Sequence, residues 1–316
     1  MRGAAALYAS GDIKHVHGAV VFDRYSRIHQ VIGIPAPPGF IPAIPKYEPC
    51  KRLTPWSRAG IGFCRILVEY TPAGVEDSAR RLGMEMRFDG LYNARMPYLR
   101  LEDVTLYTHP QYALEQVYRQ GHPQVLKTLY RIARSLEKLP IRGLGLTGSL
   151  ATLTYNPLHS DIDIVVFEAL DPAGLVETLE TLGRPELDTI EYVGPLRGSY
   201  RVGWRRRLVD GKRVTFVAAP REPGSMCKPL STYWTIDPPA AKAVETRLYI
   251  PPGQPSALHY PPCAHSEEGV WIVSFEYNVA LELFEGGEFR VTAEAGSKGH
   301  ALYVGVRGLE TGIQRV

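Results

Sequence analysis

The sequence predicts an α+β fold in three parts: a β-rich N-terminal unit (1–104), a core of helices and strands (105–235) and a β-rich C-terminal unit (236–316). Three observations support this. Apolar residues recur at helical spacing through about 110–139, a glycine-rich apolar stretch at 141–147 precedes an apolar strand at 161–168, and short strand-like runs between turn residues fill both flanks. The 316 residues are enough for such domains to bury a core without disulfides.

In the N-terminal unit, short apolar runs alternate with turn residues from about 12 to 50. Six prolines between Pro35 and Pro49 exclude a helix and a central strand there, because proline has no amide hydrogen to donate. Further along, we expect a strand at Phe63–Tyr70 and a helix near Glu76–Met84.

In the core, the helical stretch at 110–139 breaks at Gly121-His122-Pro123, where Pro123 suits the first turn of a new helix. Another helix is expected at Pro172–Leu182. The pair Asp210-Gly211 predicts a two-residue hairpin between Val202–Val209 and Lys212–Ala218. Later strands are expected in the C-terminal unit at Val270–Phe275, Glu288–Glu294 and Ala301–Val306.

Composition narrows the class of protein. The chain has 26 prolines but only three asparagines and seven glutamines, which favours a thermophilic source. The four cysteines form no CxxC pair, which argues against a zinc ribbon. The sequence contains no signal-peptide core and no run of about 18 apolar residues, so we expect a cytoplasmic protein with no membrane partner. The residues say nothing about the oligomeric state.

The charge is unevenly spread. The net charge is only +3, but the segment from Arg197 to Lys228 has nine basic and two acidic residues and so carries +7. Such a run forms either a solvated surface strand or an anion-binding wall. On a hairpin with alternating side chains, Arg205, Arg207 and Arg213 are expected to share one face and are the candidate anion-binding residues.

The stretch that indicates chemistry joins a Gly-Ser pair to two aspartates. Gly148-Ser149 follows the glycine-rich strand, and eleven residues separate it from Asp161-Ile162-Asp163 at the start of the next strand. Residues i and i+2 of a strand project from the same face, so Asp161 and Asp163 are expected to converge on one site. The same residues could also form a glycine turn followed by two aspartates that only cap the strand and have no catalytic or binding role.

This combination suits the binding of a metal–nucleotide complex. Glycine lets the backbone approach phosphates closely, and a serine at a helix start adds a hydroxyl donor. Mg²⁺, or Mn²⁺ in its place, is held by one or two carboxylates together with substrate phosphates. We therefore expect Gly148 and Ser149 to bind a nucleoside triphosphate, and Asp161 and Asp163 to be both the metal ligands and the catalytic residues.

These residues resemble the signature of the DNA polymerase β-type nucleotidyltransferase superfamily: hydrophobic-Gly-Gly/Ser, a spacer, then Asp-hydrophobic-Asp/Glu-hydrophobic. Thr147 stands where that signature has a hydrophobic residue. The resemblance implies a polymerase β-like core, metal dependence and a nucleoside triphosphate substrate. More narrowly, the chain resembles a group of uncharacterised predicted nucleotidyltransferases from thermophiles in four segments: Pro37-Pro38-Gly39, Pro45-Lys46-Tyr47, Asn156-Pro157 and the tail Ser274–Ala295.

One part of the superfamily pattern is missing. Active members usually carry a third carboxylate on a neighbouring strand, but the strand expected there, Arg213–Ala218, has no acid, and Thr215 is its nearest polar residue. Asp188 and Glu191 are the substitutes if their segment forms an adjacent strand. His159, two residues before Asp161, could touch a phosphate or the acceptor.

A second candidate metal site is the set His259, Cys263 and His265, although these residues lack the paired spacing of structural zinc sites.

The predicted function is transfer of a nucleoside monophosphate to an acceptor hydroxyl. RNA is the first expectation for the acceptor, because of the +7 segment, followed by a protein hydroxyl and a small molecule such as an aminoglycoside. The missing third acid keeps open an alternative, an inactive module that binds a nucleotide or RNA. The preferred base cannot be read from the sequence.

Overall fold

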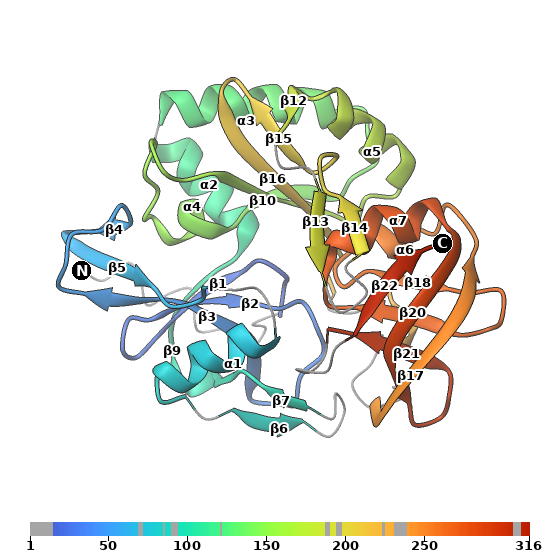
Figure 1. Ribbon diagram of the computed structural model, residues 1–316. Coiled ribbons are helices and arrows are strands. Elements are labelled where there is room, and N and C mark those ends of the chain that lie inside the picture. Colours follow the sequence, from blue (N-terminus) through green and yellow to red (C-terminus); the bar gives the residue numbers. More distant parts are fainter. Residues whose placement is uncertain are drawn as a thin grey trace.

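The computed structural model describes residues 15–68, 72–84, 86–89, 94–120, 122–186, 190–193, 198–222, 225–230, 239–305 and 311–316. It is a mixed α+β fold with three large sheets that follow one another along the chain (Figure 1). The predicted α+β class is confirmed, and both flanks consist mainly of strands.

The N-terminal sheet has the strand order β4-β5-β3-β2-β1-β9, and β8 also pairs with β3. Its strands are β1 (Val20–Asp23), β2 (Ile28–Val31), β3 (Phe40–Cys50), β4 (Ser57–Arg58), β5 (Ile61–Arg65), β8 (Tyr98–Arg100) and β9 (Val104–Thr108). The same part of the chain contains helix α1 (Pro72–Arg81), the short turn η2 (Leu101–Asp103) and the small hairpin β6 (Arg87–Asp89) and β7 (Ala94–Met96).

The proline-rich tract forms a central strand, so the expectation that prolines exclude one there is wrong. Strand β3 carries Pro42, Pro45 and Pro49 and is paired on both sides. It changes partners along its length, from β8 to β2 to β5, so each ladder contains only one of these prolines. A proline carbonyl still accepts hydrogen bonds, and that of Pro42 accepts one from the amide of Ile32 at 2.8 Å.

The core sheet has the order β10-β11-β16-β15-β12, in which only the pair β11–β16 is parallel. Its strands are β10 (Gly143–Leu146), β11 (Ile162–Phe167), β12 (Arg184–Pro185), β15 (Arg206–Val209) and β16 (Lys212–Ala219). Its helices are α2 (Pro110–Gln120), α3 (Pro123–Leu136), α4 (Gly148–Thr152) and α5 (Pro172–Thr181). The predicted helix break, the helix from Pro172, the strand at 161–168 and the hairpin are confirmed, and Asp210 and Gly211 have φ of +50° and +76°.

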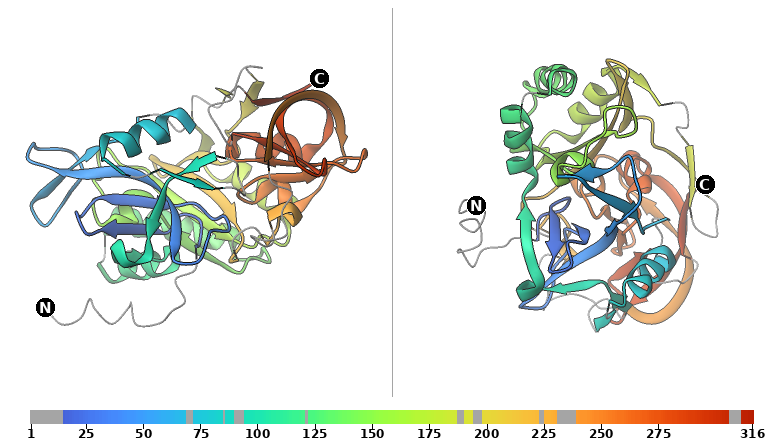
Figure 2. Two further views of the ribbon diagram at one scale, coloured as in Figure 1. Left: turned by 90° about the horizontal axis from the view of Figure 1, so that it is seen from below. Right: turned by 90° about the vertical axis from the view of Figure 1, so that its left-hand side faces the viewer.

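The two faces of β11 have different environments. Ile162 and Ile164 are buried in the same cluster as Leu129 and Ile132 of α3. On the opposite face, Val165 is buried with Val16 of the N-terminal segment. Figure 1 shows the helices α2–α5 and the core sheet in the upper part of the molecule and the N- and C-terminal sheets below them, and the right-hand view of Figure 2 shows the helices beside the core strands. The alternation of β11 therefore turns its odd-numbered residues, which include Asp163, away from the helices.

The C-terminal sheet has the order β17-β20-β21-β19-β18, and β22 also pairs with β20. Its strands are β17 (Pro239–Ile250), β18 (Cys263–His265), β19 (Trp271–Ser274), β20 (Gly287–Gly296), β21 (Ala301–Val304) and β22 (Gly312–Arg315). It carries α6 (Pro255–Leu258), α7 (Ala280–Glu285) and η4 (Tyr277–Val279), and a separate hairpin joins β13 (Ile190–Val193) to β14 (Gly198–Arg201). The short turn η3 (Lys228–Leu230) lies before it. Within the described ranges, no helix combines the length and the apolar character needed to span a bilayer.

Two disulfides, which the cysteine spacing did not predict, cross-link the fold. Cys50 and Cys64 join the paired strands β3 and β5, with their Cα atoms 5.8 Å apart. Cys227 and Cys263 join the segment after β16 to β18, with Cα atoms 5.5 Å apart. Cys263 is therefore bonded to another cysteine and is not a metal ligand. Both ring nitrogens of its predicted co-ligand His259 contact backbone groups, the carbonyl of Pro255 and the amide of Ala169.

Candidate functional site

Asp161 and Asp163 line a cleft of about 830 Å³ to which the N-terminal, core and C-terminal parts of the chain all contribute residues. The core sheet forms one wall, and the first two residues of α4, Gly148 and Ser149, also line the cleft. The structure thus brings together the four residues that the sequence motif singled out. Their convergence follows from the alternation of β11, which directs both carboxylates to the face that is not covered by helices.

Gly148 lies directly against the carboxylate of Asp163. Its φ is +60°, and a β-carbon there would overlap Oδ2 of Asp163 and come within 3.1 Å of its Cγ. Neighbouring Thr147 fixes this approach, because its amide donates to the carbonyl of Asp163 at 3.0 Å and its hydroxyl donates to the carbonyl of Gly18 at 2.5 Å. A glycine is thus required both by the backbone conformation and by the space beside Asp163.

Ser149 presents a hydroxyl without a protein partner. The residue is only 9% exposed, and its Oγ is buried with no hydrogen-bond partner among the described residues. A buried polar group without a partner is costly, so such a group in a cleft fits the role of donor to a ligand oxygen. The helix that contains Ser149, α4, has only five residues, so the hydroxyl itself is the more informative feature.

The electrostatics around Asp163 favour a bound cation. Burial and the neighbouring Asp161 carboxylate raise the pKa of Asp163 to about 7, whereas the charges of Lys46, Arg205 and Arg206 act in the opposite direction. Two carboxylates this close repel each other, and a divalent cation with hard oxygen ligands would relieve that repulsion. The part of the chain that the structure describes has no group of three or more His, Cys, Asp or Glu side chains that could hold a metal. The aspartate pair would therefore share its metal with substrate oxygens.

The hairpin arginines that face the aspartates are not the set expected from the sequence. The register pairs Arg206 with Thr215, which in turn pairs with Asp163, so Arg206 rather than Arg207 lies on the face of the aspartates. Arg206, Arg213 and Arg205 all line the cleft. Arg205 lies in the turn before β15, with its guanidinium 5.2 Å from the centre of the Tyr277 ring.

Arg207 was a candidate anion-binding residue, and its environment does not support that role. Its side chain is only 4% exposed, and it donates to four backbone carbonyls, at the end of α5 and in the turn before β15: those of Glu180, Leu182, Gly183 and Gly203. Arg207 thus satisfies carbonyls left unpaired at a helix end.

Other members of the basic segment also make internal contacts. Arg201 forms ion pairs with Glu282 and Glu285, and Arg213 lies 3.7 Å from Glu186. Lys212 donates to the carbonyl of Pro157, and Arg221 donates to the carbonyl of Arg142. Tyr200, Val202 and Trp204, which alternate along the same segment, are all buried. Much of the +7 segment therefore holds the fold together.

No carboxylate lies on either strand beside β11 at the level of Asp163. Its parallel neighbour β16 places Thr215 opposite Asp163, as the sequence indicated, and its other neighbour β10 has no acidic residue. Strand β13, which contains Glu191, pairs with β14 in a separate sheet and not with β11 or β16. The segment of Glu191 therefore does not form the strand beside β11 or β16 that was expected to bring this residue to the site. Asp188 lies outside the described residues.

Two acids that sequence reasoning missed do line the cleft. Glu186 follows β12 and lines the cleft. Its backbone amide donates a hydrogen bond to the carbonyl of Arg206 at 3.0 Å. Glu276 precedes η4, and its Oε2 is buried with no hydrogen-bond partner among the described residues. Burial raises the pKa of Glu276 to about 7. No local motif marks either residue, because only the packing of distant segments brings them to the cleft.

His159 lines the cleft at its exposed rim, where its amide donates to the carbonyl of Asn156 at 3.1 Å. Its position is compatible with the expected contact to a phosphate or an acceptor.

A scan against protein-family models, a search of curated proteins and a search of solved structures each found no match to this chain.

Proposed function

We propose that this chain is a metal-dependent nucleotidyltransferase that moves a nucleoside monophosphate from a nucleoside triphosphate to an acceptor hydroxyl. The observation that carries the proposal is the close approach of Gly148 to the carboxylate of Asp163, with Asp161 and the unpartnered Ser149 hydroxyl in the same cleft. A turn that merely capped a strand would have no need for a glycine at this point or for a buried hydroxyl without a partner.

The side chains of the cleft have distinct roles in this proposal. Ser149 donates its hydroxyl to a phosphate oxygen, and Arg206 and Lys46 supply positive charge beside the triphosphate. Asp161 and Asp163 would hold Mg²⁺ or Mn²⁺, which neutralises charge on the phosphates and aligns the attacking and leaving oxygens when bound. The acceptor hydroxyl gives up its proton to water as its oxygen bonds to the α-phosphorus, the bond between the α-phosphorus and the oxygen that bridges to the β-phosphate breaks, and pyrophosphate leaves.

For the acceptor, we propose an RNA hydroxyl first and a protein hydroxyl or a small molecule next. Arg206 and Arg213 are the basic side chains of the hairpin strands that line the cleft, so an RNA end is a better fit than a long single-stranded track. Arg207 is buried against carbonyls and cannot extend such a track.

The test uses radiolabelled nucleotides. The protein is incubated with each α-labelled nucleoside triphosphate, Mg²⁺ or Mn²⁺, and short RNAs, a protein mixture or aminoglycosides, and both pyrophosphate release and label transfer are measured. Transfer by the wild type that is lost in Asp161→Asn and Asp163→Asn but kept in Asp77→Asn, a change on the exposed face of α1, supports the proposal. If wild type and Asp163→Asn behave alike with every acceptor, the catalytic proposal fails.

A second candidate function is an inactive module that binds a nucleotide or RNA. Thr215 opposite Asp163 favours it, since a metal–nucleotide complex can be held by two acids without a third to activate a hydroxyl. Calorimetry separates the two proposals. Metal-dependent binding of a nucleoside triphosphate with no turnover on any acceptor would favour the module.

A further inference from the structure

The N-terminal sheet presents an aromatic pair to the cleft. Tyr47 and Trp56 both line it, and their ring centres are 5.7 Å apart at an angle of 50°. Both side chains are half-buried. Aromatic rings that remain partly accessible beside a polar site are suited to stacking with a flat ligand.

An irregularity in β3 aims this strand at the cleft. The pairing with β2 shifts between Ile28, opposite Tyr47, and His29, opposite Pro45, so Lys46 is an extra residue. Consecutive residues of a regular strand point to opposite faces, but Lys46 and Tyr47 both line the cleft. Tyr47 therefore lines the same cleft as Asp163.

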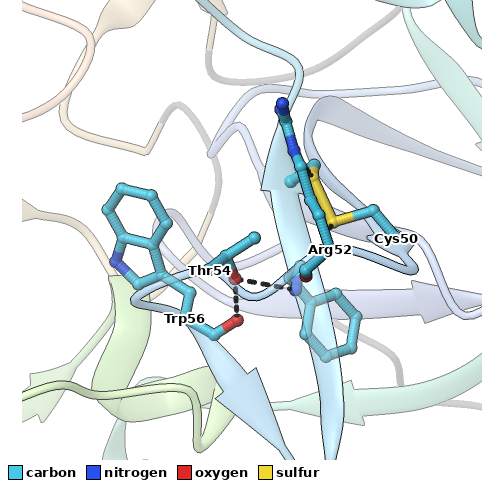
Figure 3. Close-up of a disulfide and its surroundings, with 6 residues drawn as sticks. Cys50, Arg52, Thr54 and Trp56 are labelled. Carbon is cyan, nitrogen blue, oxygen red and sulfur yellow. Dashed lines mark hydrogen bonds between the residues drawn. A yellow bond between two sulfur atoms is a disulfide. The ribbon is translucent and has the colours of Figure 1, made fainter.

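Trp56 is held by a compact loop. Thr54 bridges this loop, because its hydroxyl donates to the carbonyl of Trp56 at 2.6 Å and accepts from the amide of Phe63 at 3.2 Å. The disulfide Cys50–Cys64 closes the base of the same loop. Figure 3 shows the indole ring on the side of the loop away from the disulfide. The backbone that carries the indole is fixed in this way, so less conformational entropy is lost when a ligand stacks on the ring.

The loop is also tied to the segment that leads to the aspartates. The side-chain amide of Asn156 donates to the carbonyl of Pro55, the residue before Trp56, at 3.1 Å. The loop that carries Trp56 and the segment that leads to Asp161 are thus in direct contact, although they are far apart in sequence.

We propose that Tyr47 and Trp56 form the platform on which the base of the nucleoside triphosphate stacks, with its phosphates directed to Ser149 and the aspartates. This inference rests on the proposed function, since it assumes that a triphosphate binds at Gly148-Ser149. It assigns the recognition of the base to the N-terminal sheet, outside the core that carries the motif.

Calorimetric titration with two probes tests the platform. ATP carries both base and phosphates, whereas inorganic tripolyphosphate carries only the phosphates, and both are titrated in the presence of Mg²⁺. Stacking of one base is worth about 1–3 kcal/mol, so Trp56→Ala should weaken ATP binding about tenfold or more and leave tripolyphosphate binding unchanged. Trp56→Phe keeps a ring and should retain most of the ATP affinity, and Tyr130→Ala, an exposed aromatic on α3, should behave like wild type.

Three results would overturn the platform. Equal effects of Trp56→Ala on ATP and tripolyphosphate, or no effect on either, would show that the ring does not contact the base. Unchanged ATP binding with weakened binding of a short RNA would assign the ring to the acceptor. If wild type binds both probes and Asp163→Asn weakens both, the proposed function survives any of these results. If wild type binds neither probe, both proposals fail.

Discussion

Gly148 and Asp163 are so closely packed that a β-carbon on the glycine would overlap the aspartate carboxylate. This contact joins the two halves of the sequence motif across the 14 residues between them. It depends on the positive φ of Gly148 and on the hydrogen bond from the amide of Thr147 to the carbonyl of Asp163. The carboxylate therefore cannot move without disturbing the turn at Gly148, to which we assign phosphate binding in our proposal.

Gly148→Ala should disable the site much as Asp163→Asn does. The new methyl group must displace Asp163, so we expect metal-dependent ATP affinity to fall by more than tenfold, as measured by calorimetry. The matched control is Gly83→Ala. Gly83 has nearly the same φ, +61°, but a β-carbon there meets nothing within 4 Å. Both variants should lose about 1 kcal/mol of stability from the strained backbone. Equal ATP binding by both variants would show that the close packing has no role in the site.

Neighbouring arginines should respond in opposite ways to removal. Arg206→Ala should weaken tripolyphosphate binding about tenfold, because its side chain lines the cleft, and should lower the free energy of unfolding less than Arg207→Ala does. Arg207→Ala leaves buried carbonyls without a donor and should lower the free energy of unfolding by about 2–4 kcal/mol. Urea titration and calorimetry on the two variants measure both quantities. The reverse pattern, with binding lost in Arg207→Ala alone, would contradict the observed register.

Glu276 should make the protein less stable as the pH rises. Burial raises its pKa from an ordinary value of 4.5 to about 7. Between these values the folded protein keeps a proton that the unfolded chain has released, so the free energy of unfolding falls as pH increases, and this decline levels off above pH 7. Glu276→Gln removes this contribution. Between about pH 5 and pH 8 the free energy of unfolding of this variant should therefore fall by about 1–3 kcal/mol less than that of wild type.

Urea titrations at the two pH values test this, with Glu245→Gln as the control because its side chain is exposed in an ion pair with Arg290. Parallel declines in wild type and Glu276→Gln would mean that Glu276 is not the titrating group.

Removing each disulfide in turn should show that stability and base binding depend on different parts of the fold. They span 36 residues (Cys227–Cys263) and 14 residues (Cys50–Cys64), so the chain-entropy model gives stabilisations of about 4 and about 3 kcal/mol. Replacing either pair by serine should lower the melting temperature. Only the loss of Cys50–Cys64, which closes the loop of Trp56, should also weaken ATP binding relative to tripolyphosphate. An equal loss of ATP affinity in both double variants would argue against a specific role for the Trp56 loop.

Local patterns in the sequence were enough to predict the elements that carry the motif. Alternation along β11 indicated that Asp161 and Asp163 share a face, and the Asp210-Gly211 turn was correct because both residues adopt the positive φ that such a turn requires. The sequence also showed that the strand Arg213–Ala218 has no acid and that Thr215 is its nearest polar residue, and the structure pairs Thr215 with Asp163.

Features that depend on long-range register could not be predicted in this way. A shift of one residue in a strand reverses every side chain, which is why Arg206 rather than Arg207 faces the cleft. The contribution of Trp56 and Glu276 to the cleft arises from the packing of distant sheets, and neither has a local signal. The strand through Pro42 and Pro45 forms because its partners change along its length, which no property of the tract alone reveals.

The most direct test of the central claim is a crystal structure of the protein with Mn²⁺ and a non-hydrolysable nucleoside triphosphate analogue. We expect an anomalous manganese peak at about 2.0–2.2 Å from carboxylate oxygens of Asp161 and Asp163, the octahedral distance typical of such small divalent ions. The triphosphate should lie against Ser149. Two results would contradict the assignment of this cleft as a nucleotidyltransferase site. Manganese and nucleotide could be bound elsewhere on the protein, or the cleft could stay empty at ligand concentrations that fill other sites.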